Sequence, residues 1–381
     1  SSLLTDSRFK VSHPECRRRS MADSMNAGAA DELGNGPFYM CGCRLQKNFF
    51  VKSCAEHFQY SGDDAAFARQ YEELIRNRGR SANLPAVEAV LAEVQAQREE
   101  RRRTPEEAAK RAQLVGASYK RLHPEVYRLD RERFLHPAFN ELVEEMSKCP
   151  DKPRAIESCV SDLTSRGLLK PLKRGIWSFP VFTAEFCDLL EAEIAHFEAS
   201  GLPVARPNSM NRFGVVLREL GMCEEFLDPL VAGCLNPIAV RLLPEFTETL
   251  DSYRPFTVKY EATAEGDRDL NLHYDNAEVT LNVNIGGAWT GGQVTFLGLG
   301  GAGAGHEDPP PISVALQRGH GVLHAGRELH QAEPVVEGRR QNLILWCRSS
   351  GIRNGECPMC RNVPQLVPTN VFAHEGFTGP P

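Results

Sequence analysis

Residues 278–285 read EVTLNVNI and alternate polar and apolar side chains without a break. Successive side chains of a β-strand point to opposite faces of a sheet, so this pattern predicts a strand with one face in a core and one polar face. Numerous short strands at turn-separated intervals are typical of a β-sandwich or a jelly roll, also called a double-stranded β-helix. Such strands are predicted at 256–260, 294–297, 312–316, 321–324 and 341–347.

Helical periodicity precedes the strands. Thr183 can cap a helix whose apolar residues between Phe186 and Phe197 form one stripe. Apolar residues also recur at helical spacing between Phe38 and Met146. We therefore predict an α+β chain with a jelly-roll core and outer helices, preceded by a helical N-terminal domain. The predicted parts are a flexible tail (1–37), the helical domain (38–150), a strand-rich domain (151–350, core 254–348) and a C-terminal tail (351–381).

The composition limits the function classes. Of the 381 residues, 41% are hydrophobic and 25% charged, and the formal charge of −6 argues against nucleic acid as the main partner. No stretch approaches the run of about 18 apolar residues that spans a bilayer. The N-terminus lacks the apolar segment of a secretory signal, although Met21 is a plausible start. The absence of an apolar span predicts a soluble protein. Twelve cysteines fit reduced thiols or a metal site better than a disulfide scaffold, so we expect the protein in the cytoplasm or nucleus.

The segment Arg98–Arg103 is rich in arginine and could resemble a nucleic-acid patch. Thr104, Pro105 and the two glutamates after them have the pattern of a helix start, with a cap, a proline at the first position and acidic residues in the first turn. Acidic residues are interleaved and aromatic residues are missing from the run. We therefore interpret it as the solvated face of a helix, and we predict a new helix from Thr104.

The residues His273-Tyr274-Asp275 come just before the alternating strand. In an extended segment, residues two apart point to one side, so the imidazole and the carboxylate can bind one ion. The pattern alone is weak, because His306-Glu307-Asp308 repeats it inside a glycine- and proline-rich stretch. A further imidazole downstream, followed by a glycine turn and an arginine at a strand start, strengthens the first site. Three ligands on one face of an iron ion would leave the opposite positions open.

Two cysteine pairs suggest a second metal site. Cys357-Pro358-Met359-Cys360 has the spacing of a zinc knuckle, which needs another pair to complete a tetrahedral site. Cys41 and Cys43 could supply that pair from the other end of the chain. The alternative is that all four are reduced structural thiols.

The metal motif resembles the Fe(II)- and 2-oxoglutarate-dependent dioxygenase superfamily, in the branch of the prolyl 4-hydroxylases and lysyl hydroxylases. That branch has an arginine or lysine ten residues after the distal histidine, and 340 − 330 = 10 here, with a proline and a glycine between His330 and Arg340. The resemblance implies that Arg340 binds the C5 carboxylate of 2-oxoglutarate. Tyr260, on the strand before the motif, and Asn282, nine residues after His273, match further cosubstrate contacts of lysyl hydroxylases.

The chain is similar in more detail to the 2-oxoglutarate and iron-dependent oxygenase domain-containing protein 2 family. The similarity spans roughly residues 38–378 and rests on segments 206–211, 272–278, 290–292 and 357–360. It implies an enzyme that uses Fe(II), 2-oxoglutarate and O2, with L-ascorbate (vitamin C) as an auxiliary reductant, and that releases succinate and CO2. The implied metal ligands are His273, Asp275 and His330, and the preferred substrate is a protein side chain.

Three alternatives stay open at this point. His320 and His324 also lie near the distal position, but ten residues beyond them stand His330 and Pro334, which cannot pair with a carboxylate. A compact turn at 334–338 would also allow His330 and Arg340 to reach one pocket. The chain could instead be a non-catalytic, sensing or partner-binding module on the same fold, or a nucleic-acid demethylase, which the acidic charge balance disfavours.

Overall fold

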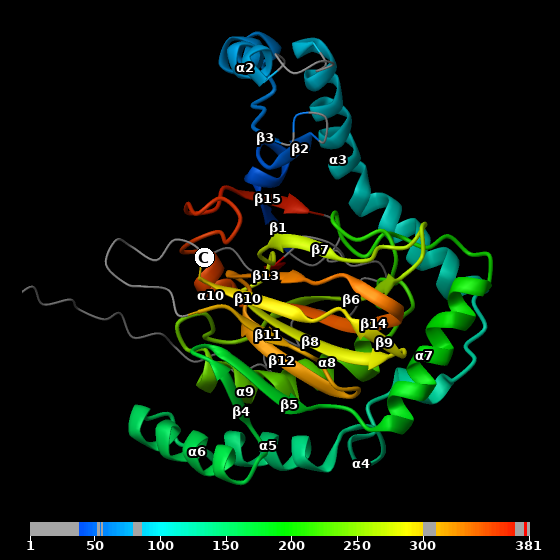
Figure 1. Ribbon diagram of the computed structural model, residues 1–381, viewed down its shortest axis with the longest axis vertical. Helices are drawn as coiled ribbons and strands as arrows, with labels where there is room; N and C mark the ends of the chain where they lie inside the picture. The colour runs from blue at the N-terminus through cyan, green and yellow to red at the C-terminus, as the bar shows by residue number, and fades with distance from the viewer. Residues whose placement is uncertain are drawn as a thin grey trace, which may run out of the picture.

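The computed structural model describes residues 38–51, 54, 56–78, 86–299, 310–369 and 377–378. The predicted tail at 1–37 and the motif at 306–308 lie outside these residues. Figure 1 shows a central β-core with helices along one side and below it, and an N-terminal part that extends away from the core. Within the described residues, no helix has the length and apolar character needed to cross a membrane.

Two antiparallel sheets form the core. The larger has the strand order β4-β5-β12-β8-β14-β6, with β9 beside β14, and the smaller has the order β11-β10-β13-β7. From β6 onward the chain passes back and forth between the sheets, which is the jelly-roll arrangement that the strand pattern predicts. The strands are β4 (Lys170–Lys173), β5 (Ile176–Pro180), β6 (Ser252–Glu261), β7 (Leu270–His273), β8 (Val279–Gly286), β9 (Trp289–Gly291), β10 (Val294–Leu299), β11 (Ile312–Val314), β12 (His320–Ala325), β13 (Glu328–Ala332) and β14 (Val335–Arg348).

The alternation along β8 separates the helical layer from the interior of the jelly roll. Leu281 and Val283 are buried in the main hydrophobic core, together with residues of α7 (Ala184–Ala199). Thr183 caps α7 as predicted, because its hydroxyl accepts a hydrogen bond from the Phe186 amide. Thr280 and Asn282, on the other face of β8, line a cavity between the sheets. The core therefore fixes which polar side chains face that cavity.

The segment 38–150 is less uniformly helical than its periodicity predicts. It begins with β1 (Phe38–Cys41), β2 (Phe49–Val51) and β3 (Glu56–Phe58), and these precede α2 (Asp64–Arg78) and α3 (Val87–Ser118). The β2–β3 hairpin packs with both helices around a separate core. The later helices of the segment join the main core instead. Those helices and the ones that follow are α4 (Arg131–Phe134), α5 (Pro137–Lys148), α6 (Pro153–Ser165), α8 (Asp228–Leu230) and α9 (Asn236–Leu242).

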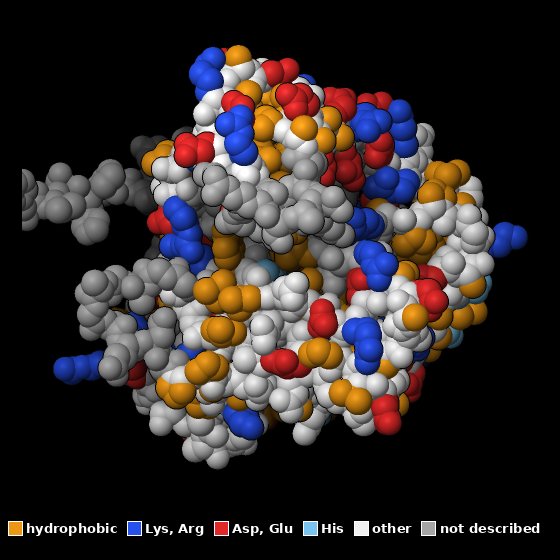
Figure 2. All heavy atoms as spheres, turned by 45° about the horizontal axis from the view of Figure 1, so that its top comes forward, with side chains coloured by type: hydrophobic (Ala, Val, Ile, Leu, Met, Phe, Trp, Pro, Cys, Tyr) orange, Lys and Arg blue, Asp and Glu red, His pale blue; other side chains and the backbone are white. Residues whose placement is uncertain are grey.

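The predicted helix start at Thr104 is wrong, because α3 continues through Pro105. The Thr104 hydroxyl donates to the Glu100 carbonyl at 2.7 Å, so it bonds backward within the helix and does not cap a new one. Arg101, in the basic run, donates to the carbonyls of Arg44, Lys47 and Asn48. Figure 2 shows acidic and basic side chains intermixed over this N-terminal part, in agreement with a solvated helical face.

The two ends of the described chain meet in a small sheet. β15 (Leu366–Thr369) and β16 (Phe377–Thr378) each pair with β1. The short helix α10 (Ser350–Arg353) follows β14 and leads to the cysteine knuckle at 357–360. The C-terminal segment, red in Figure 1, therefore lies between the jelly roll and the N-terminal helices.

Candidate metal and cosubstrate site

His273, Asp275 and His330 come together at the edge of the cavity between the two sheets. β7 ends at His273, and its antiparallel pairing with β13 places His330 opposite His273. Asp275 Oδ1 lies 3.7 Å from His273 Nε2 and 3.8 Å from His330 Nε2. One potential ligand atom from each of the three residues lies within 4.8 Å of the other two. The three side chains can therefore bind one metal ion.

Hydrogen bonds orient all three side chains. The Nδ1 atoms of His273 and His330 lie 2.7 Å and 2.8 Å from the carbonyls of Asn271 and Glu328, which directs both Nε2 atoms to the common centre. Thr280 donates to Asp275 Oδ2 at 2.6 Å, so Oδ1 remains for the metal. Burial and the neighbouring His330 imidazole lower the pKa of His273 to about 4. The His273 imidazole is consequently neutral near pH 7, as metal binding requires.

The three ligands would leave coordination positions of a bound metal ion free. Structural zinc sites have four protein ligands, whereas two imidazoles and one carboxylate occupy only one face of an octahedral ion. Among the described residues, no fourth histidine, cysteine, aspartate or glutamate completes this group. Such a triad with free positions is characteristic of non-haem Fe(II) oxygenases.

His324 and His320 occupy other positions on β12. The His324 ring is fully buried and packs 4.9 Å from the His330 ring, centroid to centroid. Its Nδ1 lies 2.8 Å from the Ala325 carbonyl, and burial lowers its pKa to about 4. His320 lies at the start of the strand, and its ring packs 6.4 Å from that of His136. Neither residue belongs to the three-ligand cluster.

Arg340 lines the same cavity as the triad. Its side chain is 2% exposed, it donates to the Gly292 carbonyl, and its guanidinium carbon lies 4.6 Å from the centre of the Tyr260 ring. Burial lowers the pKa of Arg340, since a desolvated cation is unfavourable. Among the described residues, no carboxylate forms an ion pair with Arg340, and its Nε has no partner. An anionic ligand in the cavity would compensate this buried charge.

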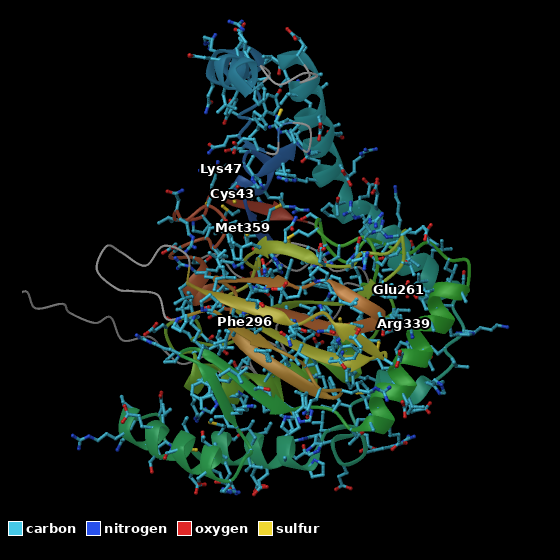
Figure 3. All side chains as sticks on the ribbon, in the orientation of Figure 1. Cys43, Lys47, Glu261, Phe296, Arg339 and Met359 are labelled. Atoms are coloured by element: carbon cyan, nitrogen blue, oxygen red, sulfur yellow. The ribbon has the colours of Figure 1, made fainter. Side chains whose placement is uncertain are left out.

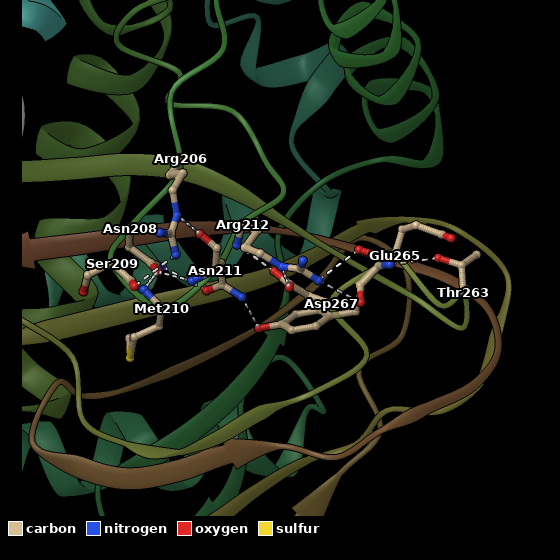
Figure 4. Close-up of polar contacts among 11 residues, drawn as sticks. Arg206, Asn208, Ser209, Met210, Asn211, Arg212, Thr263, Glu265 and Asp267 are labelled. Atoms are coloured by element: carbon tan, nitrogen blue, oxygen red, sulfur yellow. Dashed lines mark hydrogen bonds and ion pairs between the residues drawn. The ribbon is translucent and has the colours of Figure 1, made fainter. Parts of the chain in front are cut away.

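Tyr260 and Asn211 form a polar wall beside Arg340. The Asn211 amide donates to the Tyr260 hydroxyl at 3.1 Å, and Asn208 in turn holds Asn211 at 3.0 Å. Figure 4 shows this network on the segment from Arg206 to Arg212. Burial raises the pKa of Tyr260, so its hydroxyl stays protonated and can donate to a ligand. Asn282 accepts from Asn342 at 2.6 Å, which leaves its amide nitrogen available toward the cavity.

Several cavity residues have no distinctive signal in the sequence. Asn208 accepts from the amides of Met210 and Asn211, as expected of a turn residue, but Asn211 also contacts Tyr260. The alternation along β8 could have indicated Thr280, which has the same face as Asn282. The position of Asn342 two residues after Arg340 on the same strand could likewise have indicated that it faces the cavity. Its place in the cavity follows from the pairing of β14 with β8.

The predicted turn at 334–338 is wrong. β13 ends at Ala332 and β14 begins at Val335, so the chain reverses within Glu333 and Pro334. Residues 335–338 are extended and pair with β9. Gly338 has φ 75°, and a Cβ there would lie 1.9 Å from the Ala288 carbonyl oxygen. This glycine therefore allows a bend within β14, after which the strand carries Arg340 into the larger sheet.

Fold and donor set together define the class: a double-stranded β-helix protein with an open site of two histidines and one carboxylate. Comparison with known proteins specifies the family. The family model described as an OGFOD2-like domain matches residues 115–248. The human 2-oxoglutarate and iron-dependent oxygenase domain-containing protein 2 is 39% identical over 348 residues, which cover 90% of this chain and 94% of the human protein. The Xenopus tropicalis protein of the same name is 37% identical over 343 residues, with the same coverage of both chains.

The chain therefore belongs to the 2-oxoglutarate and iron-dependent oxygenase domain-containing protein 2 family. Among solved structures, a Pseudomonas putida prolyl-4-hydroxylase is 18% identical, covers 51% of this chain and 98% of its own, and has a TM-score of 0.34. The family assignment rests on the relatives that match over 90% of the chain. Their names specify iron and 2-oxoglutarate.

Proposed function

We propose that this protein is an Fe(II)- and 2-oxoglutarate-dependent dioxygenase that hydroxylates a substrate, preferably a protein side chain. The observation that carries the proposal is the position of Arg340. Its buried guanidinium has no described acidic partner and lines the same cavity as His273, Asp275 and His330. A metal triad alone would suit several ions. A triad beside a desolvated, fork-shaped cation suits a dicarboxylate that must reach the metal at one end.

The residues of the cavity have separate roles in this proposal. His273, Asp275 and His330 would hold Fe(II), and three protein ligands would leave coordination positions for 2-oxoglutarate and O2. Arg340 binds the distal C5 carboxylate, and Tyr260 and Asn282 donate hydrogen bonds in the same region. When bound, iron and 2-oxoglutarate supply the oxidation of a substrate C–H bond by O2, with release of succinate and CO2.

The apolar lining of the cavity has a role of its own. Phe256, Val258, Leu270, Val294 and Ile344 line it together with the polar groups. Exclusion of water by these side chains strengthens the pairing of Arg340 with a carboxylate, because charge interactions are stronger at low dielectric. Exclusion of water also protects the oxidising site from side reactions.

The preference for a protein side chain as substrate rests on the similarity of the motif to enzymes that act on lysine and proline residues. The same similarity is the ground for proposing L-ascorbate as the auxiliary reductant. Fold-level analogy supports the reaction class more strongly than the substrate. The substrate class can be tested by mass spectrometry of cellular proteins for the gain of one oxygen atom. Modified peptides that disappear when His273 is replaced would identify substrates. If no cellular protein lost a modified peptide on replacement of His273, the proposal of a protein substrate would be contradicted.

The catalytic proposal is tested by uncoupled turnover. Protein loaded anaerobically with Fe(II) is mixed with 2-oxoglutarate and O2, and succinate is measured. Slow succinate release that depends on His330 is the expected result. Complete absence of succinate from iron-loaded protein that binds 2-oxoglutarate would contradict a catalytic role and favour the sensing or partner-binding module.

A smaller effect is expected at Tyr260. Tyr260→Phe removes a donor to the bound carboxylate, and hydrogen bonds to charged groups contribute about 1.5–3 kcal/mol, so 2-oxoglutarate affinity should fall by about tenfold or more. Tyr253→Phe is a matched control, since Tyr253 is also buried on β6 but donates to Asp228, outside the cavity. Calorimetric titration of the Fe(II) protein measures both. Equal affinities in the two variants would exclude Tyr260 from the cosubstrate site.

A further inference from the structure

Four cysteines from opposite ends of the chain converge at one point. Cys41 Sγ lies 3.9 Å from Cys360 Sγ, and Cys43 Sγ lies 3.9 Å from Cys357 Sγ. All four sulfur atoms lie within 4.8 Å of one another, and none of them is in a disulfide. Figure 3 shows Cys43 and Met359 near each other above the jelly roll. The cluster is thus a group of four free thiols.

The spacing fits a tetrahedral metal ion. A tetrahedron with metal–sulfur bonds of about 2.3 Å has sulfur–sulfur edges of about 3.8 Å. Two edges of the cluster are 3.9 Å long. Four thiolates also leave no open position, which distinguishes a structural site from the open triad at His273, Asp275 and His330.

Both pairs are held by backbone structure. Cys41 is the last residue of β1 and pairs with Leu366 of β15, and the Gly42 amide donates to the Gln365 carbonyl at 2.7 Å. In the other pair, the Cys357 amide donates to the Asn362 carbonyl at 2.8 Å, which closes the knuckle. Arg361, directly after Cys360, has φ 59°, a left-handed conformation that costs free energy outside glycine. The fold therefore positions the four sulfurs independently of any disulfide.

We propose that Cys41, Cys43, Cys357 and Cys360 bind one Zn²⁺ ion as a closed structural site, and that this site positions the segment 274–278. The second half of the proposal rests on the proposed role of His273 and Asp275 as iron ligands. Arg361 places its guanidinium carbon 5.8 Å from the ring centre of Tyr274, the residue between those two ligands. The zinc site thus extends directly to the iron-binding segment.

Hydrogen bonds and an ion pair also join the C-terminal segment to the segment 274–278 and to Arg327. Arg353 of α10 donates to Glu278 at 2.9 Å and to Asn276 at 3.0 Å, and both Arg353 and Glu278 are buried. Arg327, two positions after the strand that carries His324, pairs with Glu356 beside the knuckle at 3.0 Å. Removal of the zinc would break the link between the knuckle and the Cys41–Cys43 pair, while the backbone hydrogen bonds of each pair would remain. The segment around Asp275 would then lose support on one side while its contact with Thr280 remained.

Metal analysis of the full-length protein, purified without added chelator, tests the zinc site directly. We expect about one zinc per chain, and a mercurial titration of native protein should release it as the four thiols react. The Cys357→Ser/Cys360→Ser variant should contain no zinc. The control variant Cys149→Ser/Cys159→Ser, which removes two neighbouring thiols elsewhere, should retain it. Zinc-free wild-type protein, or iron bound by these cysteines, would overturn the assignment, and neither result depends on the oxygenase proposal.

The positioning role has a separate readout. Fe(II) affinity of the Cys357→Ser/Cys360→Ser variant should fall roughly tenfold relative to the control variant, as is typical when residues that support metal ligands are changed. If the variant does not fold, partial zinc removal from wild-type protein by the mercurial gives the same comparison. Unchanged Fe(II) affinity in zinc-free, folded protein would overturn the positioning role and leave the zinc site itself intact.

Discussion

Arg340→Ala should weaken 2-oxoglutarate binding by about two to three and a half orders of magnitude while the protein still binds Fe(II). The buried C5 carboxylate would lose its only proposed cationic partner, and an uncompensated buried charge costs about 3–5 kcal/mol. Each 1.4 kcal/mol corresponds to a factor of about ten in affinity. Fe(II) binding should persist, because Arg340 is not among the residues that can bind the metal. Titration of the charge-transfer band of the Fe(II) complex measures the affinity.

Arg339→Ala is the matched control for this variant. Arg339 is the preceding residue on β14, but its side chain is 42% exposed and pairs with Glu191 at 2.8 Å. Its loss should change 2-oxoglutarate affinity little. Arg340→Lys adds a second comparison, because lysine keeps the charge but cannot form the two parallel hydrogen bonds of a guanidinium. An affinity loss below tenfold in Arg340→Ala would exclude the proposed pairing.

His330→Ala should abolish both iron binding and succinate release, whereas His324→Ala should retain iron. The reason is geometric: His330 Nε2 lies 3.8 Å from Asp275 Oδ1, while His324 packs behind the His330 ring and is outside the cluster. Loss of one of three protein ligands leaves two, which is too few to hold Fe(II) firmly against water. Loss of His324 leaves a void behind His330, so turnover can fall without loss of metal.

Iron content by elemental analysis and succinate by chromatography distinguish the two variants. His320→Ala is a further control, since His320 lies at the beginning of β12, away from the metal cluster. The opposite ranking, with iron lost in His324→Ala and retained in His330→Ala, would assign the ligand to His324. It would also remove the spacing argument for Arg340.

The jelly roll could be predicted from the sequence because β8 has one face in each of two environments. The apolar residues from Val279 to Ile285 face the hydrophobic core, and two of the polar residues between them line the cavity. A shift of the strand by one residue would exchange these two faces. The convergence of His273 and His330 is harder to predict. It depends on the pairing of β7 with β13, and the spacing to Arg340 indicates it only through resemblance to known enzymes.

Local signals failed where tertiary contacts decide the structure. Thr104 and Pro105 have the pattern of a helix start, yet α3 is fixed at both ends, by Val90 and Val94 in one core and Val115 in the other. The helix therefore continues despite the proline. In the same way, Gly338 has the character of a turn residue but serves a bend inside β14.

The cysteine cluster joins residues that are far apart in the sequence. Cys43 and Cys357 are 314 residues apart, and no periodicity links them. The sequence offered Cys41 and Cys43 as a possible partner pair for the knuckle, but it left reduced structural thiols as the alternative, and the pairing of β1 with β15 brings the two pairs together. Asn211 beside Tyr260 is a similar case, since its contact crosses from a loop to β6.

Anaerobic titration of the Fe(II)-loaded protein with 2-oxoglutarate tests the central claim most directly. Simultaneous binding of the metal by His273, Asp275 and His330 and of the distal carboxylate by Arg340 predicts a visible charge-transfer band that saturates at one 2-oxoglutarate per chain. The band should be absent from His330→Ala and shifted to much higher 2-oxoglutarate concentration in Arg340→Ala. A wild-type protein that contains one Fe(II) in this site and develops no band at saturating 2-oxoglutarate would contradict the account.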